Sequence, residues 1–509
     1  MSSSIISLVG AYWPAMVILV IILYVLRNRF SYNLHSTPGP FLNSISAAPR
    51  MISVWNGKSH LDDHALHLKY GPIVRVAPHI ISISDLSAVD QIYGISSNFF
   101  KSDFWEPVRF YDEEGIVPDP LVLKDKTLHS RMKRNANNAY ATTSLIQLEP
   151  LLDDIIERLL RVLDEAYVNK PKVCDIGEYL HFFSMDAIFA LTFGNDLNFI
   201  EKGDKDGNIQ MLQDSMRYLS VVGQSPWMHR YLKGNPYIDF LIGLFSKSSN
   251  GTILEQIMNI AISQRTKTLE DMSDDPDAPC TFLKRLLLNQ QRNPKSITDR
   301  ELNTHSFGNI IAGGDTTSTA MRAVFANVTQ YPEKADRLVA ELLEAGCDKD
   351  SIVRYTVSSN LPYLNAFIKE SMRLHPSVGM MLSREVPQGG AMIGPYKVAA
   401  GTEVGVNAWI IHRDPDIFPN PDEFNPDRWI TADASDLSRM KRAFFAFGGG
   451  RHTCSGQHIS MFEISKLLPT LLLRYRTSWV HPNDYQNIDV SNYFFTVQKG
   501  VKVNLTSRD

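Results

Sequence analysis

A cysteine stands inside a glycine-rich stretch near the C-terminal end of the chain, in FGGGRHTCSG at residues 447–456. Its glycines let the backbone approach a flat or bulky group closely, because glycine has no side chain. A helix expected after Ser455 would point its first amides at Cys454 and stabilise a thiolate. A lone cysteine is by default a small buried apolar residue. This loop instead favours a thiolate that binds a metal or acts as a nucleophile.

Two further stretches place charges where they can meet. Glu370 and Arg373 in KESMR lie three residues apart, on one face of an expected helix that Pro376 ends. Alone, such a pair is an ordinary surface ion pair. Arg428, in FNPDRW at 424–429, precedes the cysteine loop and can join the pair in a buried triad.

A long helix is expected over residues 298–330. Thr298 and Glu301 have the spacing of a capping box, and Tyr331-Pro332 ends the pattern. Its middle reads AGGDTTSTA at 312–320, where adjacent glycines weaken a helix. Close packing of another helix explains the glycines as well as space for a ligand does. The neighbouring Asp315 and Thr316 favour a functional site, because a carboxylate and a hydroxyl are costly to bury without partners.

The other elements are mostly helical. Leucines and isoleucines between 148 and 163 recur with the period of an amphipathic helix. Strand-like alternation is confined to short pieces at 73–83 and 391–406. The predicted fold class is therefore mainly α with a small β region.

The N-terminal segment differs from the rest of the chain. Residues 5–26 contain 22 residues without a charge, enough to cross a bilayer as a helix, and Arg27 and Arg29 follow. A cleavable signal peptide has its basic residues before the apolar run, so a retained anchor with the body in the cytosol is expected. The predicted organisation is an anchor at 1–30, a Pro/Gly hinge at 31–40 and one catalytic domain at 41–509.

Composition excludes several classes of protein. The chain has 51 Lys and Arg against 55 Asp and Glu, a net charge of −4, which argues against nucleic acid as the main partner. Its 4 cysteines are widely separated and form no C-x-x-C pair, so neither a disulfide framework nor a thiolate zinc site is expected.

Together, FGGGRHTCSG, KESMR, the P-x-R-W of FNPDRW and AGGDTT resemble, in order and spacing, the motifs of the cytochrome P-450 family of haem-thiolate monooxygenases. The cysteine loop, similar to F-x-x-G-x-R-x-C-x-G, is the most specific element. KYGPIVRVAPHIISISD at 69–85 and KSDFW at 101–105 are similar to fungal members of secondary metabolism, such as pisatin demethylase-like enzymes.

The resemblance implies a role for each matching residue around a haem b (iron protoporphyrin IX). Cys454 is the expected iron ligand, with Phe447 packed beside it and Gly456 in the loop that holds it. The family's propionate-binding arginine after His129 is replaced here by Lys133 or Arg134. The expected propionate contacts are Arg451, Arg384 and His129. The triad of Glu370, Arg373 and Arg428 is expected to hold the loop against the haem.

On the other side of the haem, the resemblance implies that Ala312 and Gly313 face the iron and leave space for oxygen. Asp315 and Thr316 are the expected catalytic pair, which delivers protons there. Large apolar residues are expected to line the substrate pocket, which predicts a lipophilic substrate such as a terpenoid, a polyketide or another aromatic scaffold. These are Phe104, Trp105, Phe110, Phe307, Val378, Met380, Met381, Phe494 and Phe495.

The implied activity is oxidation of a lipophilic small molecule with O₂ and NADPH-derived electrons. A separate flavoprotein reductase is expected as partner, because the chain has no G-x-G-x-x-G fingerprint. A group of basic residues could form the face on which this reductase docks, or their charges could be ordinary solvated surface charges. These residues are Arg131, Lys133, Arg134, Arg439, Lys441 and Arg442. The expected location is the endoplasmic reticulum membrane, single-pass, with the catalytic domain cytosolic. The alternative is a haem-thiolate isomerase or dehydratase that needs no reductase.

Overall fold

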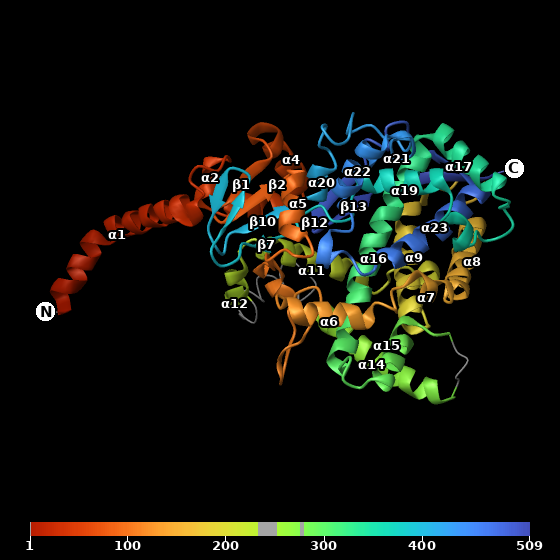
Figure 1. The fold of residues 1–509 in the computed structure, drawn as a ribbon, viewed down its shortest axis with the longest axis horizontal. Helices are drawn as coiled ribbons and strands as arrows, with labels where there is room; N and C mark the ends of the chain where they lie inside the picture. Colours follow the sequence, from red (N-terminus) through yellow and green to blue (C-terminus); the bar gives the residue numbers. More distant parts are fainter. Residues whose placement is uncertain (1, 233–251, 275–278, 509) are drawn as a thin grey trace.

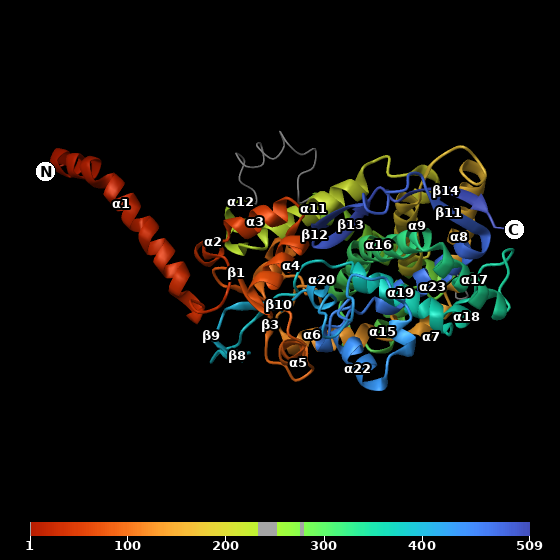
Figure 2. The same ribbon diagram turned by 90° about the horizontal axis from the view of Figure 1, so that it is seen from above.

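A computed structural model describes residues 2–232, 252–274 and 279–508. Figure 1 and Figure 2 show a large helical region around α16 (Asp299–Gln330) and a smaller β region on the side from which α1 (Ser2–Phe30) extends. The predicted class, mainly α with a small β region, is confirmed. The predicted strand pieces are β1 (Ile73–Ala77), β2 (Ile80–Ile83), β8 (Ala391–Ile393), β9 (Tyr396–Val398) and β10 (Glu403–Val406).

The helices differ widely in length. The other longer ones are α3 (Ala48–Trp55), α4 (Ser59–Tyr70), α5 (Leu86–Tyr93), α6 (Lys126–Ala136), α8 (Glu149–Ala166), α9 (Ile176–Phe193), α11 (Asn208–Val222), α14 (Thr252–Asp274), α15 (Phe282–Arg292), α17 (Pro332–Glu344), α19 (Pro362–Leu374), α22 (Ala434–Ala443) and α23 (Gln457–Arg474). The short ones are α2 (Phe41–Ile45), α7 (Thr142–Ile146), α10 (Phe199–Lys202), α12 (His229–Leu232), α18 (Tyr355–Ser358), α20 (Ala408–Ile411) and α21 (Arg428–Thr431).

The largest sheet has the order β1-β2-β10-β7-β3 and carries one wall of the site. β10 pairs parallel with β2 and antiparallel with β7 (Arg384–Glu385), so that Val404 lies between Ile81 and Arg384. The remaining strands are β3 (Phe100–Lys101), β4 (Tyr111–Asp112), β5 (Gly115–Ile116), β6 (Cys174–Asp175), β11 (Tyr475–Trp479), β12 (Asp489–Tyr493), β13 (Phe495–Lys499) and β14 (Lys502–Ser507).

Helix α16 begins and ends where the sequence predicts. The Thr298 hydroxyl accepts the Glu301 amide, and the Glu301 carboxylate accepts the Thr298 amide, which forms both halves of the capping box. Most of the helix is buried, so it runs through the body of the protein.

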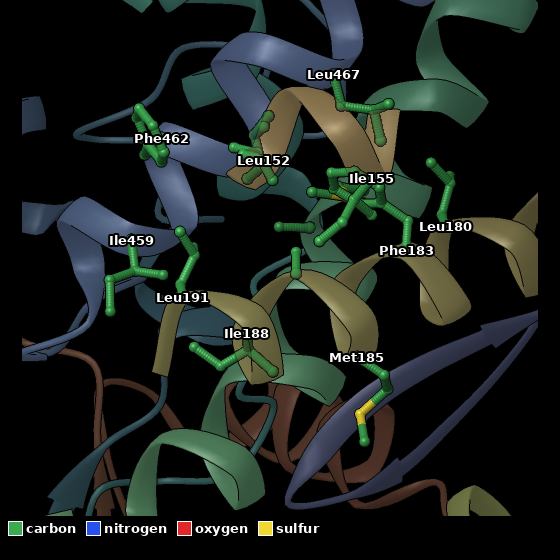
Figure 3. Packing of buried hydrophobic residues seen from close by; sticks show 14 of the residues in the cluster. Leu152, Ile155, Leu180, Phe183, Met185, Ile188, Leu191, Ile459, Phe462 and Leu467 are labelled. Atoms are coloured by element: carbon green, nitrogen blue, oxygen red, sulfur yellow. The ribbon is translucent and has the colours of Figure 1, made fainter. Parts of the chain in front are cut away.

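Helix α9 packs against α16 on one side and against α8 and α23 on the other. Figure 3 shows its apolar side chains among those of α8 and α23, whereas Met185 and Ile188 lie on its other side. A Cβ added to Gly313 would lie 2.5 Å from the Ile188 side chain, and one added to Gly314 would also collide with Met185. The glycine pair therefore permits close helix packing, and Gly313 also lines the central cavity.

This packing makes a testable difference between two glycines of α16. In Gly313→Ala the new methyl group meets Ile188, and overpacking costs about 1–3 kcal/mol, which outweighs the gain in helix propensity. A methyl group added to Gly308 would meet no neighbouring atom within 4 Å, so Gly308→Ala keeps that gain. We expect urea-unfolding midpoints to fall for the first variant and to hold or rise for the second. Equal shifts would contradict the packing account.

A buried arginine connects the end of α1 to the first strand of the sheet. Arg75 of β1 is 1% exposed and donates hydrogen bonds to the carbonyls of Asn28, Arg29 and Leu34, at 2.6, 2.9 and 3.1 Å. These bonds attach the end of α1 and the turn after it to the sheet. The segment Tyr12–Asn33 is long and apolar enough to cross a membrane, and none of it is buried in the protein.

Candidate functional site

A cavity of about 350 Å³ lies between the middle of α16 and the cysteine loop. Most of the residues predicted for the site line it. These are Cys454, Phe447, Gly456, Ala312, Gly313, Thr316, Arg384 and His129. Two predicted residues, Asp315 and Arg451, do not belong to its lining.

The Cys454 side chain is exposed to this cavity, although protein surrounds it. Burial raises the pKa of its thiol, whereas the backbone amides of Gly456 and Gln457 and the charge of Lys133 act in the opposite direction. These amides belong to the start of α23, as the sequence predicts. Hydrogen bonds at a helix N-terminus therefore offset part of the cost of burying a thiolate here.

Two glycines give the loop its path. Gly448 and Gly450 have φ of +68° and +59°, which side chains rarely tolerate. A Cβ at Gly450 would also overlap the carbonyl oxygen of Tyr93. The loop returns on itself through a hydrogen bond of 2.9 Å from the Cys454 amide to the Phe447 carbonyl. The glycines thus serve close approach to neighbouring backbone as well as to the cavity.

The predicted triad is formed and buried. Arg373 donates to both carboxylate oxygens of Glu370, each at 2.9 Å. One of these oxygens also accepts from Arg428 and the other from Trp429, again at 2.9 Å. Glu370 and Arg373 are each 0% exposed and Arg428 is 8% exposed. Every oxygen of the buried carboxylate is paired, which is the condition for such a cluster to be stable.

His412 connects the triad to the cysteine loop. Its Nδ1 donates to the Arg373 carbonyl at 2.9 Å, and its Nε2 accepts the Phe445 amide at 2.7 Å. This bond pattern requires the neutral imidazole, because a protonated ring cannot accept a hydrogen bond. Burial lowers the pKa of His412 to about 3. No local motif in the sequence marks this residue.

The pKa of His412 predicts a pH dependence of stability. Below its ordinary pKa of 6.5, the unfolded chain binds a proton that the folded protein does not, until pH falls to about 3. Stability is therefore lost as pH falls, by about 1.4 kcal/mol per unit. His412→Gln keeps an acceptor and cannot titrate. We expect His412→Gln to be less stable than the wild type at pH 7. The difference between their free energies of unfolding, measured in urea, should become about 2 kcal/mol smaller at pH 5, because only the wild type loses this contribution. Parallel pH profiles would contradict this role.

Cationic and imidazole groups gather at one end of the cavity. Burial, with neighbouring cations, lowers the pKa of Lys101 to about 7 and that of His129 to about 3. Burial also lowers the pKa of Arg384. Lys133 donates to the carbonyls of Thr453 and Arg451, at 2.6 and 3.2 Å, and so holds the loop backbone. Sequence reasoning did not single out Lys101, since its significance depends on these neighbours in space.

The position predicted for Arg451 needs correction. Its guanidinium donates to the Ile95 carbonyl at 2.6 Å, and it does not line the cavity. Counted along the motif, the arginine position is held by His452, which does line the cavity. Its ring lies 3.3 Å from the His129 ring, nitrogen to nitrogen. The short 3₁₀ turn Gly450–His452 carries the two side chains in different directions.

The wall opposite the loop is made by α16. Ala312 is exposed although its neighbours on the helix are mostly buried, because it borders the cavity. The Thr316 hydroxyl donates to the Ala312 carbonyl at 2.5 Å. Ser377 in turn donates to the Thr316 carbonyl at 2.7 Å. The hydroxyl proton of Thr316 is thus engaged, and its lone pairs remain available to accept a hydrogen bond.

Asp315 faces away from the cavity and toward α9. Its carboxylate lies 2.8 Å from His181 Nε2, and the two side chains are 1% and 4% exposed. The His181 imidazole is thus the polar group that lies beside this buried carboxylate. His181 could not be assigned from the sequence, because only the packing of α9 on α16 brings it to Asp315.

The cavity has the groups that a haem requires. Cys454 offers a thiolate ligand, and the cationic end offers donors for carboxylates: Arg384 Nε and His129 Nδ1 have no hydrogen-bond partner in the described part of the chain. Anionic groups would favour the charged forms of Lys101 and Arg384, whose pKa values burial lowers. The donor set therefore fits a haem with its propionates at this end.

Apolar side chains line the rest of the cavity. Of the residues predicted there, six are found in the lining: Trp105, Phe307, Val378, Met380, Phe494 and Phe495. Phe104 lies behind Trp105, with ring centroids 5.1 Å apart, and Phe110 lies behind Phe307 at 4.9 Å. Met381 belongs to a separate small core with the first two strands.

The basic residues predicted for partner docking are partly engaged within the protein. Arg442 pairs with Asp90 at 2.6 Å and Arg131 pairs with Glu301. Lys441 and Arg134 are exposed and form no ion pair with any described residue. These two residues, one in α22 and one in α6, therefore keep their positive charge free of any described ion pair.

Comparisons with known proteins agree with this geometry. The family model "Cytochrome P450" matches residues 38–505. The chain is 32% identical to cytochrome P450 monooxygenase mpaDE' of Penicillium brevicompactum over 95% of its own length, but spans only 56% of that protein. It is 30% identical to cytochrome P450 monooxygenase cicH of Emericella nidulans, with 96% and 97% of the two chains covered. A cytochrome P450 monooxygenase of Aspergillus terreus is 31% identical over 91% of this chain and 95% of its own. The predicted resemblance to fungal members is confirmed.

Proposed function

Because the chain belongs to the cytochrome P450 family, we propose that it is a membrane-anchored monooxygenase that oxidises a lipophilic small molecule in secondary-metabolite biosynthesis. The observation that carries the proposal is the Cys454 thiol, which faces the same cavity as Ala312 and Thr316 of α16. The predicted division into an anchor at 1–30, a hinge at 31–40 and a catalytic domain at 41–509 is part of the proposal.

The chain's own residues would hold the haem at both ends. Cys454 would bind the iron, and the amides of Gly456 and Gln457 would help to stabilise its thiolate against the effect of burial. Lys101, His129, Arg384 and His452 would bind the propionates. A haem held by thiolate supplies oxygen activation and the oxidation of unactivated C–H bonds. The protein's task is to orient the substrate, exclude water and control protons.

Proton control would fall to Thr316 and Asp315. The Thr316 hydroxyl donates to the Ala312 carbonyl. Its oxygen can therefore accept a hydrogen bond from a group that would lie over Ala312 and Gly313. Asp315, which lies beside His181 on the far side of the helix, would take up a proton there and pass it on when its carboxyl group turns from that partner. His181 is thus a positioning residue for Asp315.

Electrons would come from NADPH through a separate flavoprotein reductase. The free charges of Lys441 and Arg134 would attract an acidic partner to the side of the protein that carries the cysteine loop. The apolar, unburied segment Tyr12–Asn33 supports anchoring in the endoplasmic reticulum membrane with the catalytic domain in the cytosol. Such an anchor would keep the enzyme and a membrane-bound reductase on one surface.

An experiment with isotopic oxygen tests the proposal against the isomerase alternative. Microsomes containing the full chain are supplied with terpenoid, polyketide and aromatic probes under ¹⁸O₂, with and without NADPH and its reductase. A monooxygenase gives labelled product only with both. Unlabelled product that forms without either would contradict the proposal and favour the isomerase, for which the proton-delivery residues Asp315 and Thr316 have no use.

A further inference from the structure

One polar side chain in the apolar part of the cavity has no partner. His305 of α16 is 5% exposed and lines the cavity, and its buried Nε2 has no hydrogen-bond partner among the described residues. A buried polar group without a hydrogen bond is unusual, and its cost is offset when a ligand supplies the missing partner. His305 therefore needs an explanation outside the fold itself.

The other polar groups nearby are already engaged. The Thr304 hydroxyl donates to the Pro118 carbonyl at 2.9 Å. Asn309 accepts from the Tyr140 hydroxyl at 2.8 Å. Asp119 accepts the Leu121 amide at 2.7 Å. His305 is thus the polar group in this region that is left to recognise a ligand, within the described part of the chain.

The environment of His305 defines what it can bind. Burial alone lowers the pKa of its imidazole to about 4, so the ring is neutral at ordinary pH. A neutral imidazole has one donor and one acceptor nitrogen, which matches a hydroxyl group, itself both donor and acceptor. Many of the other residues that line the same cavity are aromatic or aliphatic, including Trp105, Phe307, Met216 and Leu219. This combination suits the hydroxyl of a phenolic ring.

The position of His305 on α16 determines its distance from Ala312, which lies at the end of the cavity nearest the proposed haem. His305 lies seven residues before Ala312, which is close to two full turns, so both lie on one face of α16. The axial separation is about 10 Å. A ligand held at His305 would therefore extend toward Ala312 and Gly313 with its opposite end.

Resting on the proposed function, we propose that His305 selects hydroxylated aromatic substrates. Its imidazole hydrogen-bonds a phenolic hydroxyl, and this bond places the far end of the molecule, about two helical turns away, over Ala312 and Gly313 where oxidation takes place.

The test compares two probes that differ at one group. 4-Phenylphenol and 4-methylbiphenyl have similar size, but only the first can hydrogen-bond. Their dissociation constants are measured with the full-length holoprotein in lipid by equilibrium dialysis, for the wild type, His305→Leu and His305→Gln. We expect the preference of the wild type for the phenol to fall about five-fold or more in His305→Leu. His305→Gln, which keeps a donor and an acceptor, is expected to retain most of it.

Thr304→Val provides the matched control, because this residue lines the same region but its hydroxyl is already engaged. Its preference for the phenol is expected to stay near that of the wild type. An unchanged preference in His305→Leu, an equal loss in Thr304→Val, or no binding of the phenol by the wild type would each overturn the proposal. Failure of the proposed function would show differently, as missing reductase-dependent oxygen incorporation with the binding preference intact.

Discussion

Arg373→Ala is expected to unfold or strongly destabilise the protein and to prevent it from holding haem. The guanidinium is fully buried and donates to both oxygens of Glu370 and to the carbonyls of His412, Pro421 and Glu423. Removing one member of a buried charge cluster costs about 3–5 kcal/mol, because the remaining charges lose their partner. The loss reaches the cysteine loop through His412 and the Phe445 amide. Urea-unfolding midpoints and haem content per chain measure both effects.

A surface arginine provides the control. Arg337 forms a comparable ion pair with Asp427 at 2.9 Å, but the two side chains are 51% and 38% exposed. Arg337→Ala should cost less than about 1 kcal/mol. Arg373→Lys keeps the charge without the planar fork and should remain markedly destabilised. If Arg373→Ala matched Arg337→Ala in midpoint and haem content, the triad would not support the loop.

Thr316→Ala is expected to separate NADPH consumption from product formation. The hydroxyl lies on the cavity wall beside Ala312, where it would accept a hydrogen bond and pass protons. Without it, electrons would still be consumed, but reduced oxygen would leave as hydrogen peroxide. Since positioned proton transfer contributes on the order of 10²-fold or more to rate, product formation should fall by about that factor. Product, NADPH and peroxide are measured in one sample.

Another threonine of the same helix gives a matched control. The Thr319 hydroxyl is buried and has no hydrogen-bond partner among the described residues, and Thr319 does not line the cavity. Thr319→Val should therefore preserve the ratio of product to NADPH. Thr316→Ser, which restores a hydroxyl, should recover much of it. Product coupling that survives in Thr316→Ala would remove this residue from the proton path.

Local patterns in the sequence predicted much of the fold, and the resemblance to a known family pointed to most of the named residues that line the cavity. The capping box at Thr298 and Glu301 and the stop at Tyr331-Pro332 are local features, so both ends of α16 could be predicted. The E-x-x-R spacing alone does not mark a buried triad, and the resemblance to a known family was needed to join Arg428 to Glu370 and Arg373. Strand positions followed from alternation of apolar residues.

Contacts between segments that are distant in the chain could not be predicted from the sequence. Asp315 turns toward His181 because α9 packs closely on α16, and no local pattern encodes that contact. Lys101 becomes part of the site only when β3 brings it beside Arg384 of β7. Arg451 lies outside the cavity lining and His452 belongs to it, a difference that a single 3₁₀ turn decides and the sequence does not show.

The carbon monoxide difference spectrum of the reduced full-length protein in membranes tests the central claim most directly. We predict the red-shifted Soret band of a thiolate-bound haem in the wild type, and its loss in Cys454→Ser, with Cys347→Ser as a control that keeps the band because Cys347 does not line the cavity. A wild-type protein that is folded and binds haem but shows no such band, or a band that survives in Cys454→Ser, would contradict the assignment of Cys454 as the iron ligand.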